Sequence, residues 1–178
     1  MKDVLLIQAK YMQEADREVY ALLDALSNEQ REAERGSYYG SLSGLARHIL
    51  GGTVFFHSLF KTALENFPGS SAAKVLSCPP VSVPKDTLTA EQWKALGSAF
   101  ETADSATVDF AAALEDAELT APVKVDWYGG NPASVPLYFM FTNLAAHGIH
   151  HRGQISQILD EMKVDNDYSG INAAFLPK

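Results

Sequence analysis

The sequence is poor in the features of secreted, disulfide-rich and nucleic-acid-binding proteins. Its 178 residues include one cysteine, Cys78, which excludes an intramolecular disulfide framework and a cysteine-rich zinc finger. Fourteen lysine and arginine residues face 22 aspartate and glutamate residues, and no two basic residues are adjacent. The formal charge of −8 argues against nucleic acid as a partner, because binding to phosphates needs clustered cations.

Long apolar runs are also missing. No stretch approaches the roughly 18 apolar residues of a membrane span, and the N-terminus lacks a signal-peptide pattern. We therefore expect a cytoplasmic protein with no membrane partner. Apolar residues make up 47% of the chain and charged residues 20%, which excludes a disordered chain. The length suits one domain over residues 1–178.

The spacing of apolar residues predicts four long helices, over residues 3–26, 42–64, 89–114 and 134–162. Ser27 and Thr89 each open a capping-box pattern, Ser41 or Ser43 is the expected cap of the second long helix, and Ser134 that of the last. Four amphipathic helices indicate an all-α four-helix bundle. The glycine pair Gly51-Gly52 lies inside the second long helix, and we interpret it as a close contact between two helix backbones.

Two connections stand out between these helices. Residues 67–88 contain four prolines and are long enough for a crossover, which replaces a plain up-down-up-down path. Residues 119–134 combine a β-prone stretch with turn residues and predict a small hairpin or an ordered loop. The tail, residues 163–178, ends in an apolar group that we expect to pack back on the body: Ile171, Ala173, Ala174, Phe175 and Leu176.

Histidines carry the strongest chemical signal. His147 and His151 are one helical turn apart, on the apolar stripe that faces the bundle interior. His48 lies on the apolar stripe of the second long helix, whereas His57 is about 180° away from it. Three inward imidazoles can hold one divalent metal and leave a position open for water or substrate. We therefore predict His48, His147 and His151 as metal ligands; hydrogen-bonded core histidines are the alternative.

Other residues near this pattern receive weaker assignments. His150 lies at the shoulder of the stripe and is interpreted as structural or as a support for the ligands, while Gln154 and Asn143 either hydrogen-bond a ligand or line the cavity. Arg152 is placed on the surface or in an interface. The acidic residues of the third long helix are expected to face solvent: Glu101, Asp104, Asp109, Glu115 and Asp116.

The segment from His147 to Gln154, HGIHHRGQ, resembles the HxxxHRGQ signature of the DinB-like, YfiT-like family of four-helix-bundle metalloproteins. The segment around His48 is similar to that family's helix-2 histidine segment. The resemblance covers essentially the whole chain and implies the same three ligands, zinc or nickel as the metal, and a homodimer. Ala146 replaces a frequent Asn of the family and Gly148 a larger residue, which concerns pocket lining and substrate.

Three functions remain open. The first, implied by the resemblance, is an enzyme that transfers a low-molecular-weight thiol to a small-molecule electrophile. Candidate residues for lining the open end of the bundle are Asp126, Trp127, Tyr128 and Tyr38 or Tyr39, although each is more often structural. A metal-dependent hydrolase is the second, weakened because Gly148 stands where an HExxH motif has its Glu. The third is a non-catalytic, metal-stabilised stress or binding protein, which would need a fourth ligand such as Cys78.

Overall fold

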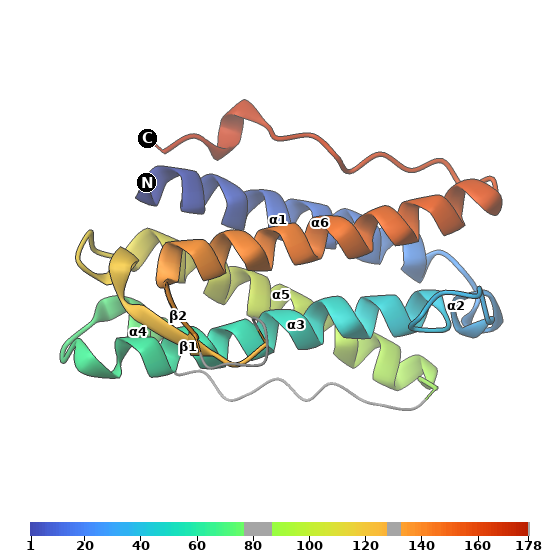
Figure 1. The fold of residues 1–178 in the computed structure, drawn as a ribbon. Coiled ribbons are helices and arrows are strands. Elements are labelled where there is room, and N and C mark those ends of the chain that lie inside the picture. Colours follow the sequence, from blue (N-terminus) through green and yellow to red (C-terminus); the bar gives the residue numbers. More distant parts are fainter. Residues whose placement is uncertain (77–86, 128–132, 178) are drawn as a thin grey trace.

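The computed structural model describes residues 1–76, 87–127 and 133–177, and long helices dominate this part of the chain (Figure 1). The long helices are α1 (Lys2–Asp24), α3 (Leu42–Ala63), α5 (Ala90–Ala113) and α6 (Leu137–Glu161). Shorter helices are α2 (Asn28–Glu32), α4 (Ser71–Val75) and 3-10 turns at Leu64–Asn66, Glu118–Thr120 and Ala173–Phe175. The predicted all-α four-helix bundle is confirmed.

Each long helix packs against two others. α1 contacts α5 and α6, and α3 contacts the same two helices, so α1 and α3 lie diagonally across the bundle. Figure 1 shows that α3 and α5 run in the same direction, opposite to α1 and α6. The chain therefore leaves α3 at one end of the bundle and enters α5 at the other, which confirms the predicted crossover. The unpredicted α4 lies in this connection, and residues 77–86, with Cys78, lie outside the described part.

Helix starts follow the capping signals in all but one case. Ser27 and Thr89 form complete capping boxes with Gln30 and Gln92, and the Ser41 hydroxyl accepts a hydrogen bond from the Gly44 amide. The prediction that Ser134 caps the last helix is wrong. Ser134 pairs in a strand, and α6 begins three residues later, after Pro136.

The hairpin before α6 is confirmed. Strand β1 (Pro122–Val125) pairs antiparallel with β2 (Ala133–Pro136), and Val123 faces Val135. Val123 and Val125 are buried against the bundle, which follows from the alternation of side chains along a strand. Residues 128–132 between the strands, including the candidate Tyr128, lie outside the described residues. The hairpin contacts α3 and α6 and lies in the half of the bundle where α3 ends and α6 begins (Figure 1).

The interior consists of two apolar clusters with a polar layer between them. One cluster centres on the stacked rings of Phe60, Phe110 and Phe141, and the other on Leu45, Trp93 and Ile155. The buried polar layer contains Asp16, Thr53, Asp104, Thr107, His151 and Arg152. The expectation that Asp104 faces solvent is therefore wrong, since its side chain is 4% exposed. Arg152, expected at the surface or in an interface, is instead buried inside the bundle and is 1% exposed.

The C-terminal tail packs back on α1 and α6 through Phe175, one of the predicted residues, and through Tyr168, which was not predicted. Phe175 is buried and its carbonyl accepts a hydrogen bond from Lys10, while the buried Tyr168 donates to the carbonyl of Arg152. Ile171 and Leu176 remain exposed. No helix in the described part of the chain is long and apolar enough to cross a membrane.

Candidate metal centre

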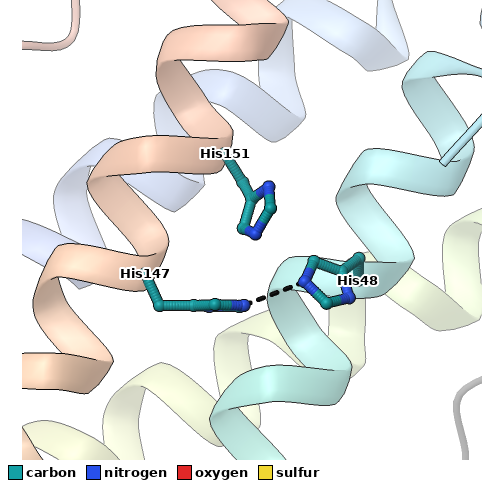
Figure 2. Close-up of side chains that lie close together, drawn as sticks. All are labelled: His48, His147 and His151. Atoms are coloured by element: carbon teal, nitrogen blue, oxygen red, sulfur yellow. Dashed lines mark hydrogen bonds between the residues drawn. The ribbon is translucent and has the colours of Figure 1, made fainter. Parts of the chain in front are cut away.

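Three histidines meet between α3 and α6. Figure 2 shows the imidazoles of His48, His147 and His151 directed toward one point between these helices. Their candidate ligand atoms all lie within 4.8 Å of one another, and the Nε2 atoms of His48 and His147 are 2.9 Å apart. In the part of the chain that the structure describes, no other cluster of three histidine, cysteine or carboxylate side chains is close enough to hold an ion.

Burial keeps these imidazoles neutral. It lowers the pKa of His48 and of His147 to about 4, and neighbouring histidines add to the effect. Burial also lowers the pKa of His151, although the bond to Gln154 partly opposes this shift. At neutral pH all three therefore present lone pairs, the form in which histidine binds a metal.

The donor set fits a four-coordinate metal ion. Metal–nitrogen bonds of about 2.0–2.1 Å place imidazole nitrogens roughly 3.3 Å apart, and the observed separations bracket that value. The buried Nδ1 of His147 has no hydrogen-bond partner among the described residues. The Nε2 atoms of His48 and His147 lie close enough to share one proton, so at least one of them has a lone pair that a metal ion could use. These three side chains could hold a single divalent ion.

Gln154 and Tyr39 fix the orientation of two of the rings. The Gln154 side-chain oxygen accepts a hydrogen bond from Nδ1 of His151 at 2.7 Å, which leaves Nε2 of that ring as the lone-pair donor. Tyr39 stacks on His48 with ring centroids 3.8 Å apart and meets His151 edge-on. Tyr39 thus lies at the site, whereas Tyr38 is 91% exposed.

Glycines create the space that these side chains occupy. A Cβ atom on Gly52 would lie 2.5 Å from Cε1 of His147, so the position accommodates an imidazole ring and not a second helix backbone as interpreted from the sequence. Nothing lies within 4 Å of the corresponding atom on Gly51. A Cβ on Gly44 would lie 1.9 Å from the carbonyl oxygen of Tyr39, so Gly44 allows the turn that carries Tyr39 to approach α3.

The remaining candidates lie farther from this point or outside the description. His150 is exposed, with its ring 4.8 Å from that of His151, and Asn143 is half-buried without a hydrogen bond in the described part. Trp127 is 42% exposed and packs near Phe55 of α3, 5.9 Å between ring centroids. His57 lies away from the cluster, as the helical spacing predicts, and bonds to Thr107 at 2.8 Å.

The role of Arg152, which follows His151 in the α6 motif, was not predicted from the sequence. Arg152 Nη1 donates a hydrogen bond to Asp16 at 2.9 Å, with both side chains buried. A Cβ on Gly148 would lie 2.9 Å from the same guanidinium nitrogen, so Gly148 makes room for Arg152 one turn later. The sequence did contain a pattern that could have indicated a buried arginine: Gly148 lies four residues before Arg152, and that spacing places the two residues on one face of a helix.

The fold and the site together define a four-helix bundle with a three-histidine cluster suited to a divalent metal. The chain belongs to the DinB family, whose family model matches residues 1–165. Comparison with curated proteins and with solved structures gave no significant match.

Proposed function

We propose that the protein is a divalent-metal-dependent enzyme that transfers a low-molecular-weight thiol to a small electrophile. The observation that supports the proposal is a set of three neutral imidazoles without a fourth ligand-forming side chain beside them in the described residues. Three protein ligands and one open position are typical of catalytic metal sites, whereas structural sites are closed by four.

His48, His147 and His151 would hold the ion, and zinc or nickel fits their nitrogen donors. A bound divalent ion would lower the pKa of a coordinating thiol and so favour the thiolate at neutral pH. Transfer then forms a carbon–sulfur bond while the leaving group departs with its electron pair, and the thiol proton passes to solvent.

The chain's own residues organise the site. Gln154 keeps the proton of His151 on Nδ1, and the stacked ring of Tyr39 restricts rotation of His48. The Phe56 ring packs near that of His147, with 6.3 Å between the ring centroids. These contacts hold the donors in place before an ion or a substrate arrives, which reduces the ordering that binding requires.

Two alternatives make different demands on the same residues. Hydrolysis needs a general acid or base, and Gly148, at the Glu position of an HExxH motif, faces Arg152 instead of the ion site. A non-catalytic metal protein needs a closed coordination shell, and its candidate fourth ligand, Cys78, lies outside the described residues. The homodimer that the resemblance implies stays a prediction, to which Ile149, 52% exposed on α6, offers an apolar contact.

The test begins with metal content. Protein purified without a histidine tag should carry, or take up from added zinc or nickel, one ion per chain. His48→Ala should abolish this uptake, while His57→Gln on the same helix should keep it, because His57 lies outside the cluster. Circular dichroism on both variants checks that each is folded.

Activity is measured separately on the same proteins. A panel of small thiols with an activated aryl halide should give thioether at a rate that falls at least about a hundredfold in His48→Ala, because loss of a first ligand removes the ion. Equal rates in the two proteins would contradict the transferase but leave the metal site intact. Wild-type protein that takes up neither metal would contradict both.

A further inference from the structure

A second polar site lies on the far side of the bundle, in a groove between α1 and α5. The α1–α5 groove has a volume of about 340 Å³, and its walls include Asp16, Tyr20, Phe100, Glu101, Asp104 and Ser105. Since α1 and α5 pack together on the side of the bundle opposite the α3–α6 pair, this groove does not open onto the three histidines. Its volume is within the range of small-molecule sites.

The charges of the groove are unbalanced toward negative. Four carboxylates and one guanidinium line it, and that guanidinium, Arg17, already pairs with Glu14 at the surface. Arg152 of α6, which does not line the groove, bonds to one oxygen of Asp16. The other oxygen of Asp16 is buried and has no hydrogen-bond partner among the described residues.

Asp104 is the residue that this arrangement leaves without a counter-ion of its own. Its side chain is 4% exposed, lines the groove, and receives no hydrogen bond from the residues that the structure describes. Burial and the charge of Asp16 raise the pKa of Asp104 well above its usual range, although Arg152 opposes this shift. A buried carboxylate without a partner is costly, so a cation in the groove would be favoured.

The walls suggest which kind of cation fits. Tyr20 and Phe100 both line the groove, with their ring centroids 6.5 Å apart, and aromatic rings attract organic cations. A metal ion is disfavoured, because no three ligand-forming side chains of the described residues meet here as they do at the histidines. From this geometry we propose that the α1–α5 groove binds an organic ammonium ion with an attached apolar group, held by Asp104 and seated against Tyr20 and Phe100.

The probe is 2-phenylethylamine, a cation at neutral pH, with 2-phenylethanol as the neutral control of the same shape. Calorimetric titration of the wild-type protein should show binding of the amine and not of the alcohol. In a nitrogen–proton correlation NMR spectrum, addition of the amine should shift the backbone amide signals of residues around Tyr20, Gly97 and Phe100, but not those of residues around His147.

Asp104→Asn should weaken amine binding by roughly tenfold or more, the loss of one charge-assisted hydrogen bond. The matched control is Asp109→Asn, on the exposed side of the same helix, which makes the same change in net charge and should bind as the wild type. Ser105→Phe, which fills the groove from an exposed position, should also abolish binding and serves if Asp104→Asn does not fold.

Three outcomes would overturn the proposal: no binding of the amine at millimolar concentrations, equal binding of amine and alcohol, or unchanged binding in folded Asp104→Asn. None of these results depends on metal loading, so they leave the function proposed for the histidines unaffected.

Discussion

Two sides of α6 solve the problem of buried polar groups in opposite ways. Toward α3, His147 and His151 contribute neutral imidazoles that have no charged partner and point at a shared space. Toward α1, the adjacent Arg152 is neutralised by a carboxylate of the protein itself, Asp16. Consecutive residues of a helix point about 100° apart, so one short segment serves both interfaces.

This difference between the two sides of α6 indicates which side can bind a metal ion. Buried imidazoles avoid the desolvation cost by staying unprotonated, and they keep lone pairs for a ligand. In the Arg152–Asp16 ion pair the two charges neutralise each other, and the pair links α6 to α1. The segment from His147 to Arg152 therefore contains two pairs of residues spaced four apart. His147 and His151 face the candidate metal site, and Gly148 makes room for Arg152, which packs against α1.

The Arg152–Asp16 ion pair can be removed by a single substitution. Arg152→Met leaves Asp16 buried without its cation, and we expect it to lower the free energy of unfolding by about 3–5 kcal/mol at neutral pH. Arg17→Met removes the same side chain from an exposed pair with Glu14 and should cost no more than about 0.5 kcal/mol. Urea denaturation of the three proteins measures both values, and similar losses in the two variants would contradict the role assigned to Arg152.

The binding side is tested by two neighbouring glycines of α3. In Gly52→Ala the new Cβ would displace the ring of His147, so we expect metal affinity to fall roughly 10–100-fold, as for other disturbances of ligand orientation. Gly51→Ala meets nothing within 4 Å and should keep the affinity while stabilising the helix by about 1 kcal/mol. Competition titration with a zinc chelator measures the affinities; equal affinities would show that Gly52 does not shape the site.

The sequence predicted the bundle and the gathering of His48, His147 and His151 because both depend on helical periodicity, and it predicted the crossover from the length of the connection over residues 67–88. Helical spacing alone separates His57 from the group, and capping boxes place the starts of α2 and α5. The tertiary partners of individual side chains were harder to predict. Asp104 and Arg152 are charged residues, a type that is usually exposed, and the burial of Arg152 could be predicted only by knowing that Asp16 of α1, 136 residues earlier, lies within hydrogen-bond distance.

The start of α6 shows a second limit. Ser134 has the right residue type for a helix cap, but pairing with β1 gives its backbone other hydrogen bonds, and the helix begins only after Pro136. Tyr39 was one of two adjacent candidates, and only the turn at Gly40 and the contact with Gly44 decide that it, and not Tyr38, stacks on His48. Such choices depend on backbone geometry that composition does not encode.

The smallest expected effect concerns the pH dependence of Asp104. Because its pKa is raised in the folded protein, the folded state holds the proton more tightly than the unfolded chain, and stability is lost as the pH rises through the folded pKa. Asp104→Asn removes that loss, so the variant should match the wild type near pH 4 and exceed it at pH 8 by about 1 kcal/mol. Asp109→Asn, exposed on the same helix, should stay within about 0.5 kcal/mol of the wild type throughout. Thermal unfolding across this range measures the difference. A variant less stable than the wild type at pH 8 would mean that the Asp104 carboxylate is held by Arg152 as firmly as Asp16 is, and that the two sides of α6 differ less than their contacts indicate.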